Sequence, residues 1–339
     1  MVCFIVPPHI LTSIQEHGDE KQKSWASHAL RISDDIREKR QTLVPPLQTP
    51  SLTIKKNRII YTAANTTDLP GQEILREGQP QINDQAANQA YSGTGATFDL
   101  YQNTYQRNSI DNKGMQLIST VHYSQKYDNA FWDGQQMVYG DGDGDLFGLF
   151  TKPIDVTGHE LTHGVTQYSA NLAYQDQSGA LNESFSDVFG ILVKQQVLQQ
   201  TAQQADWLIG EGIFTSKVNG KALRSMKAPG TAYDDPVLGK DPQPGDMNHF
   251  VTTSDDNGGV HINSGIPNHA FYLAAVGIGG YAWETAGKIW YTTLTEKLKS
   301  DAQFVDCANA TIESAGELFG KGSKEENALQ EAWKRVGVL

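Results

Sequence analysis

The pattern of apolar and polar positions changes along the 339-residue chain. Residues 51–63 are rich in β-branched side chains and residues 117–124 alternate in polarity, which predicts strands. Residues 83–108, between them, have the spacing of a helix. Beyond Asp155 the chain is mostly helical, with predicted helices at 155–170, 183–200, 264–276, 283–299, 303–319 and 323–336. A strand-containing half followed by a helical half predicts an α+β fold with two lobes.

The first 50 residues, called the leader here, differ from the rest. They contain one predicted helix, at 23–42, flanked by proline pairs at 7–8 and 45–46. Because a segment with one helix cannot bury much core alone, we expect the leader to be an interaction arm or to dock on the rest of the chain. The predicted domains are the leader at 1–50, an N-terminal α/β lobe at 51–155 and a C-terminal helical lobe at 156–339.

Composition narrows the class of protein. With 38% hydrophobic and 19% charged residues the chain is globular, and its formal charge of −12 argues against non-specific nucleic-acid binding. No apolar run reaches the roughly 18 residues that span a bilayer. Two cysteines, Cys3 and Cys307, exclude a disulfide framework, and the N-terminus lacks the charged region of a secretory signal.

The segment His159-Glu160-Leu161-Thr162-His163 carries the clearest chemistry. On a helix, positions i and i+4 share one face, so both imidazoles can bind one zinc ion. Glu160 lies about 100° around the helix, where it can reach a metal-bound water. A coincidence of two unrelated histidines is the alternative.

A third ligand candidate lies in the segment Asn182-Glu183-Ser184-Phe185-Ser186-Asp187. Glu183 and Asp187 again share a helix face, so one carboxylate can bind the metal while the other accepts the outer N–H of a ligating histidine. Two histidines and one glutamate leave a fourth position for water, as in catalytic sites. Farther on, Asp256 precedes His261 across a Gly-Gly turn, so it could orient an imidazole that donates to an oxyanion.

These motifs resemble those of the thermolysin-like metallopeptidases. The resemblance runs from about residue 87 to 339 and includes HELTH, GALNESFSDVFG, DNGGVHINSG and YDNAFWDGQQMVYGDGDG in the family's order. It implies a zinc endopeptidase in which His159, His163 and Glu183 bind one catalytic zinc ion and Glu160 is the general base. It also implies that His261 and Tyr174 stabilise the oxyanion and that Asp256 orients His261. Asp187 and Asn182 would orient the zinc ligands. The substrate backbone would be held by Asn129, Ala130 and Arg224.

The resemblance also implies a substrate pocket. The primed-side pocket of the family corresponds to apolar residues here, which implies cleavage on the N-terminal side of bulky hydrophobic residues. The pocket residues are Phe150, Val156, Ile209, Ile213 and Leu223. Membership of the structural core is the alternative for each of them.

Two departures from thermolysin resemble the protealysin subgroup. Lys194 stands where the family's double-calcium site has a bridging carboxylate, and an ammonium group donates to carboxylates but cannot coordinate a cation. We therefore expect no calcium at that site. The leader is also short, which implies an inhibitory propeptide that is removed near 48–52.

The segment Pro45-Pro46-Leu47 matches the subgroup's Pro-Pro-Leu motif and is predicted to occupy the primed side of the cleft. A plain proline-rich linker is the alternative. A further alternative, suggested by the position of Cys3 near the N-terminus, is that its thiolate caps the zinc ion.

Other functions are disfavoured by particular residues. A zinc aminopeptidase would need an element that holds a free amine, which the sequence lacks, while a non-catalytic zinc module would not need Glu160 and His261. We expect a monomer that binds protein and peptide substrates and its own leader, with no nucleic acid and no membrane span. The family implies secretion, although the absent signal leaves a cytoplasmic pool possible.

Overall fold

The computed structural model describes residues 3–40 and 54–339. The strands are β1 (Cys3–Phe4), β2 (Arg58–Thr62), β3 (Gln72–Arg76), β4 (Leu117–Val121), β5 (Ala130–Trp132), β6 (Met137–Tyr139), β7 (Leu208–Ile209), β8 (Arg224–Ser225), β9 (Asp234–Asp235) and β10 (Gly239–Lys240). The α-helices are α1 (Pro8–His17), α2 (Glu20–Arg40), α3 (Gln85–Asp99), α4 (Ile154–Gln167), α5 (Asp176–Leu198), α6 (Asp256–Asn263), α7 (Gly265–Ile278), α8 (Ala286–Thr292), α9 (Phe304–Phe319) and α10 (Lys324–Arg335). Short η segments are Leu100–Thr104, Met247–His249 and Thr293–Lys297.

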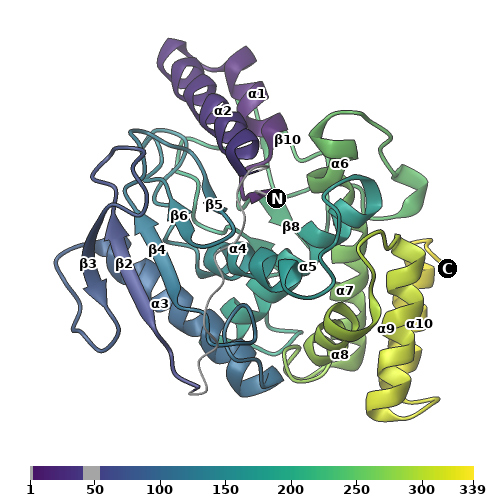
Figure 1. Cartoon of the computed structure of the whole chain (residues 1–339). Coiled ribbons are helices and arrows are strands. Elements are labelled where there is room, and N and C mark those ends of the chain that lie inside the picture. Colours follow the sequence, from purple (N-terminus) through teal and green to yellow (C-terminus); the bar gives the residue numbers. More distant parts are fainter. Residues whose placement is uncertain (1–2, 41–53) are drawn as a thin grey trace.

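A six-stranded mixed sheet forms the N-terminal lobe, in the order β1-β5-β6-β4-β2-β3. Strands β2, β4 and β6 are parallel, and β3 and β5 pair antiparallel with β2 and β6. The edge beside β5 is filled by β1, which comes from the leader more than 120 residues earlier in the chain. Helices α5 and α7–α10 form the second lobe, with α4 between it and the sheet (Figure 1). The predicted α+β fold with two lobes is confirmed.

The leader packs against the rest of the chain across the top of both lobes (Figure 1). Its described part, residues 3–40, contains two helices, so the prediction of one helix was incomplete. Pro8 is the first residue of α1, where proline fits because its missing N–H would have no partner inside the helix. The core-facing residues Ile10, Leu11 and Ile14 of α1 are buried, which supports docking over a free arm.

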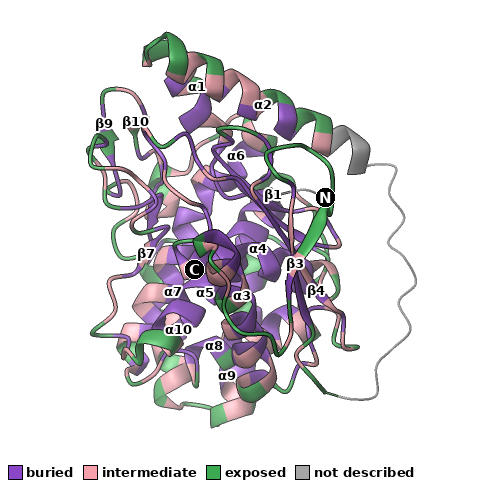
Figure 2. Ribbon diagram, turned by 90° about the vertical axis from the view of Figure 1, so that its left-hand side faces the viewer, coloured by how far each residue is buried: buried purple, intermediate pink, exposed green. Residues whose placement is uncertain are grey.

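Helices α4 and α5 lie at the centre of the molecule and are buried over most of their length (Figure 2). Two glycines allow these helices to approach each other closely. A Cβ atom on Gly158 would lie 2.9 Å from the Cα atom of Gly190, and one on Gly190 would lie 2.6 Å from the Asp155 carbonyl oxygen. Since such contacts are too short for side chains, glycine at both positions sets the helix separation that brings the site residues together.

Candidate active site

The three ligand candidates meet between α4 and α5. The Nε2 atoms of His159 and His163 are 3.0 Å apart. The Glu183 carboxylate lies 3.4 Å from the first and 3.6 Å from the second, through Oε2 and Oε1 respectively. All three side chains are buried, and one ligand atom from each lies within 4.8 Å of the others. Two imidazole nitrogens and one carboxylate with a common centre fit a catalytic zinc ion.

Hydrogen bonds on the far side of each imidazole orient it toward this centre. Nδ1 of His159 is 2.8 Å from Asp187 Oδ1, and Nδ1 of His163 is 2.8 Å from Asn182 Oδ1. Both Nε2 atoms are therefore left to face the centre. Burial lowers the pKa of His163 to about 3, which favours the neutral imidazole that a metal ligand must be. The effect of burial on His159 is outweighed by Asp187 and Glu183, which raise the pKa of His159 to about 9, so metal binding there would displace a proton.

Asp187 is itself held by two residues. Arg224 donates to both of its oxygens at 2.8 Å, and the Asn268 side-chain amide donates to Oδ2 at 2.8 Å. Sequence reasoning placed Arg224 in contact with substrate and did not find Asn268. The buried charge of Asp187 is thus balanced by a guanidinium, and burial of both groups keeps the pair dry.

Glu160 points toward the same centre from α4. Its Oε2 atom accepts the backbone N–H of Trp132 at 2.9 Å, while Oε1 is buried and has no hydrogen-bond partner within residues 3–40 and 54–339. Burial raises the pKa of this carboxyl to about 8, and a cation at the centre would lower it. One oxygen is therefore anchored and the other is available to a water molecule.

His261 approaches from the opposite side. Its Nδ1 atom is 2.7 Å from Asp256 Oδ1, and its backbone N–H donates to Asp256 Oδ2 at 2.9 Å. The turn between them needs glycine: Gly258 has φ 82°, and a Cβ atom there would lie 2.1 Å from Asp176 Oδ1. Nε2 of His261 is consequently left facing the Tyr174 hydroxyl at 3.2 Å, and that hydroxyl also donates to Glu183.

The first strand of the leader lies beside this centre along the edge of β5, in the space called the cleft here. In β1, Cys3 pairs with Trp132 and Phe4 with Phe131. The Phe4 carbonyl oxygen lies 3.1 Å from His261 Nε2. Sequence reasoning missed Phe4–Val6 as site residues, although the apolar run before the proline pair at 7–8 was a signal.

The three residues predicted to hold a substrate backbone hold this leader strand. Ile5 donates its N–H to the Ala130 carbonyl at 3.1 Å, and its own carbonyl accepts from Arg224 Nη1 at 3.1 Å. The side chain of Asn129 pairs with both backbone groups of Val6, at 2.9 and 3.2 Å. The predicted motif Pro45-Pro46-Leu47 lies outside the described residues, so its placement stays a prediction.

The predicted pocket residues are all buried. Ile209 pairs with Arg224 across the β7–β8 ladder, and Leu223 donates its backbone N–H to Ile209. The Phe150 ring stacks on Phe147 with ring centroids 5.8 Å apart. Ile209 and Leu223 are thus joined through the backbone to Arg224, whose guanidinium contacts the Ile5 carbonyl.

Lys194, the residue predicted to replace calcium, lies among carboxylates. Its Nζ atom donates to both oxygens of Asp206 at 2.8 and 3.0 Å and to Glu211 Oε2 at 3.0 Å. Burial raises the pKa of the neighbouring Asp155 to about 6 although the Lys194 charge opposes this. The ammonium group supplies the positive charge that these carboxylates require.

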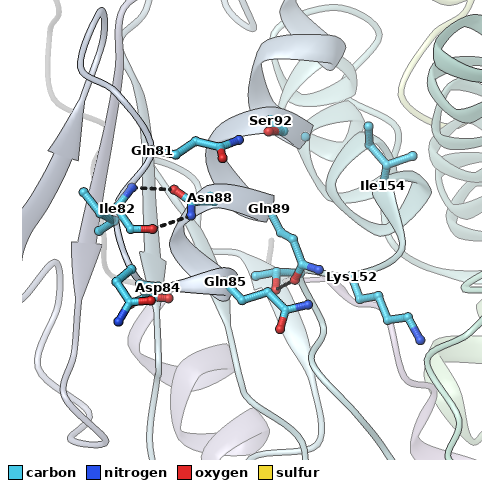
Figure 3. Close-up of a pocket in the computed structure, with 12 residues that line it drawn as sticks. Gln81, Ile82, Asp84, Gln85, Asn88, Gln89, Ser92, Lys152 and Ile154 are labelled. Atoms are coloured by element: carbon cyan, nitrogen blue, oxygen red, sulfur yellow. Dashed lines mark hydrogen bonds between the residues drawn. The ribbon is translucent and has the colours of Figure 1, made fainter.

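A hollow of about 470 Å³ lies elsewhere, at the N-terminal end of α3 (Figure 3). Its wall includes several amide side chains, and Asn88 is held by both backbone groups of Ile82, at 2.7 and 3.1 Å. Its lining includes none of the metal-centre residues. The candidate active site is therefore the centre between α4 and α5.

Comparison with known proteins agrees with this geometry. Residues 48–167 match the family model of the thermolysin metallopeptidase catalytic domain, and residues 170–338 match that of its alpha-helical domain. An extracellular metalloprotease of Pectobacterium carotovorum is 48% identical over 99% of this chain and 96% of that protein. Thermolysin of Alicyclobacillus acidocaldarius is 42% identical over 82% of this chain and 50% of that protein.

A solved structure extends the likeness to the leader. The precursor of protealysin from Serratia proteamaculans is 51% identical, with a TM-score of 0.92, over 99% of this chain and 100% of that one. No helix among the described residues is long and apolar enough to cross a membrane. With its zinc ligand set and these matches, the chain belongs to the thermolysin metallopeptidase family and is a zinc-dependent metalloendopeptidase in precursor form.

Proposed function

We propose that the mature enzyme cuts peptide chains on the N-terminal side of bulky hydrophobic residues and that the leader inhibits it until removed. The observation that carries this proposal is the leader strand in the cleft, with the Phe4 carbonyl 3.1 Å from His261 and the Ile5 carbonyl on Arg224. A substrate strand added to the edge of β5 would be held in the same way. The side chain after the cut bond would then take the place of Ile5, which is fully buried.

The residues around the centre have complementary roles in this proposal. His159, His163 and Glu183 would hold the zinc ion, which would supply a lowered pKa for a water molecule and polarisation of the substrate carbonyl. Glu160 Oε1 accepts the proton of the attacking water and carries it to the leaving amine. Nε2–H of His261 and the Tyr174 hydroxyl donate to the oxygen on which negative charge develops. Asp256 Oδ1 accepts from Nδ1 of His261 and, although burial opposes it, its charge raises the pKa of His261. This favours the imidazolium, which carries a proton on both nitrogens and so has an Nε2–H to donate.

Substrate position depends on Asn129, Ala130 and Arg224. Their contacts with Ile5 and Val6 fix two successive peptide units. We propose that the apolar pocket of Phe150, Val156, Ile209, Ile213 and Leu223 selects the residue after the cut bond, since burying a Leu or Phe side chain contributes about 2 kcal/mol.

Inhibition by the leader follows from occupancy of the same cleft. A segment tethered in cis acts at millimolar effective concentration, so modest contacts suffice until the chain is cut. We propose cleavage near 48–52 as the activating step, and release of the enzyme from the cell as a monomer. The name of the Pectobacterium relative, an extracellular metalloprotease, supports release.

Digestion of a denatured protein by the matured enzyme tests the specificity. Mass spectrometry of the products should show new N-termini that are mostly Leu, Ile, Phe or Val. A matched variant, Leu223→Asp, places a charge at a residue that is 1% exposed, so it should lose this preference if it folds; circular dichroism checks the fold. New N-termini dominated by charged residues in the wild-type digest would refute the proposal.

A further inference from the structure

The leader strand is held as a substrate would be, with every backbone polar group from the Phe4 carbonyl to the Val6 carbonyl paired in the cleft. The Ile5 N–H is bonded to Ala130, the Ile5 carbonyl to Arg224, and both groups of Val6 to Asn129. Such complete pairing fixes the register, because a shift by one residue would leave buried groups without partners.

This register places one particular peptide bond at the reactive groups. The Phe4 carbonyl oxygen is 3.1 Å from His261 Nε2, which is itself 3.2 Å from the Tyr174 hydroxyl and 3.6 Å from Glu183 Oε1. The next carbonyl along the chain, that of Ile5, has already turned to Arg224. The Phe4–Ile5 bond therefore lies between the carbonyl that faces His261 and the carbonyl that faces Arg224.

The side chains on both sides of this bond are accommodated. The Phe4 ring packs on Phe131 with centroids 5.4 Å apart, and Phe4 and Ile5 are 1% and 0% exposed. The strand that receives the leader also supplies the Trp132 N–H that holds Glu160. Docking of the strand and orientation of the base thus depend on the same short element, β5.

We propose that the precursor hydrolyses its own Phe4–Ile5 peptide bond and that the trimmed leader remains in the cleft. This inference rests on the proposed function. Water adds to the Phe4 carbonyl carbon, Glu160 takes a proton from that water and passes it to the Ile5 nitrogen, and the bond between carbon and nitrogen breaks. The products are a free carboxylate on Phe4 and a free amine on Ile5, so the reaction consumes one water molecule and no other reactant.

The trimmed leader keeps most of its contacts. Arg224 still binds the Ile5 carbonyl and Asn129 still binds Val6. The helices add further hydrogen bonds: Ser13 Oγ to the Val237 carbonyl at 2.9 Å, Gln22 to Asp145 at 2.7 Å, and His28 to Ser124 at 3.0 Å. Loss of residues 1–4 therefore leaves the enzyme inhibited, and activation needs the separate cut near 48–52.

Intact-mass measurement and N-terminal sequencing of the zinc-loaded full-length chain test this inference. We expect a new N-terminus at Ile5 before any cut near 48–52, with a first-order rate constant that does not change over a hundredfold dilution, as for a reaction in cis. Glu160→Gln, which keeps the side-chain size, should slow the loss of residues 1–4 by ~10²–10⁴-fold.

A second readout needs neither metal nor activity. In the metal-free Glu160→Gln chain, the amide hydrogens of Ile5 and Val6 should exchange much more slowly than those of the exposed turn at 64–68. Rapid exchange at Ile5 and Val6 would overturn the register and with it the inference.

Different results would contradict the self-cleavage and the proposed function. If residues 1–4 remain attached while the chain freed of its leader cleaves a quenched peptide, the function stands and the self-cleavage is wrong. If the zinc-loaded chain without its leader cleaves no peptide, both are wrong.

Discussion

At the scale of single residues, the two oxygens of Glu160 have different environments. Trp132 holds one of them, and the other faces the centre without a hydrogen-bond partner among the described residues. The carboxyl is fully buried, and burial raises its pKa. Its position suits proton transfer to and from a water molecule, whereas the metal ligands come from other side chains.

Replacing Glu160 with glutamine should therefore remove catalysis and leave the metal site intact. We expect peptidase activity of the leader-free enzyme to fall by ~10²–10⁴-fold, because only the base is lost, with about one zinc ion per chain still bound. Elemental analysis and a quenched-peptide assay measure the two quantities. Activity within threefold of wild type would contradict the role of Glu160.

A second residue-scale prediction concerns His122, which bridges Asp141 at 2.8 Å and Asp84 at 3.0 Å. The hydrogen bond with Asp141, opposed by burial and aided by Asp84, raises the pKa of His122 to about 9. A raised pKa means that the folded state binds the proton more tightly, so this stabilisation is complete below about pH 6.5 and is lost as the pH rises through about 9.

We expect the melting temperature of wild type to exceed that of His122→Gln at pH 6 and the difference to shrink by pH 10. Differential scanning calorimetry across this range measures it. A difference that stays constant with pH would show that the charge of His122 does not stabilise the fold.

At the scale of elements, the helices predicted from the sequence agree best with the structure where the apolar periodicity extends over many residues. Helices α4, α5, α7, α9 and α10 were predicted within a few residues, except that α5 begins at Asp176 and not at 183. The i, i+4 spacings within α4 and α5 then placed the ligand candidates on common helix faces. The contact between the two helices depends on Gly158 and Gly190, whose role no periodicity indicates.

Pairing between distant segments could not be predicted in this way. The residues before Pro7 are few and all apolar, so they show no alternation of apolar and polar positions. Their partner, β5, lies more than 120 residues away in the chain. The sequence pattern does not predict α1, because a proline pair indicates a boundary, whereas Pro8 is the first residue of the helix. The Trp132 backbone N–H on Glu160 and the Asn268 amide on Asp187 arise from tertiary packing alone.

The Lys194 cluster joins α5 to the segment 206–211, and it gives a prediction at this scale. Thermal stability should hardly change when calcium is added, because the ammonium group already neutralises the carboxylates. A ligand bound only to the folded state at a hundred times its dissociation constant would add ~2.7 kcal/mol. A calcium-dependent rise of many degrees in melting temperature would refute this reading of Lys194.

The matched variant is Lys194→Met, which has a similar length and no charge. It should lower the free energy of unfolding by roughly 2 kcal/mol, since Asp155 would remain buried without its positive neighbour. Urea unfolding measures this change. An unchanged midpoint would show that the cluster contributes little.

At the scale of the whole molecule, the leader connects the two lobes. Its strand extends the sheet of the first lobe, and its helix α1 contacts the loops around Tyr233 and Val237 in the second lobe, at 3.0 and 2.9 Å. The cleft between them is thus filled by the chain itself. Mutation can show whether residues 4–6 or the predicted motif at 45–47 contributes more to inhibition.

Two variants of the precursor make this comparison. Ile5→Asp puts a charge at a buried position of the leader strand, which is costly without a partner, so the uncut precursor should gain activity. Replacing Pro45, Pro46 and Leu47 with alanine should do the same only if that motif also lies in the cleft. Equal, low activity of Ile5→Asp and wild-type precursors would show that the strand is not the inhibitor.

The most direct test of the central claim, a zinc endopeptidase silenced by its own leader, is one activity measurement on two forms of the chain. Purified full-length protein and protein cut near 48–52 are loaded with zinc and assayed on a quenched peptide with Leu after the scissile bond. We predict negligible activity for the uncut form and full, chelator-sensitive activity for the cut form. Equal activity of the two forms would contradict inhibition by the leader, and activity that survives zinc removal would contradict the metal centre.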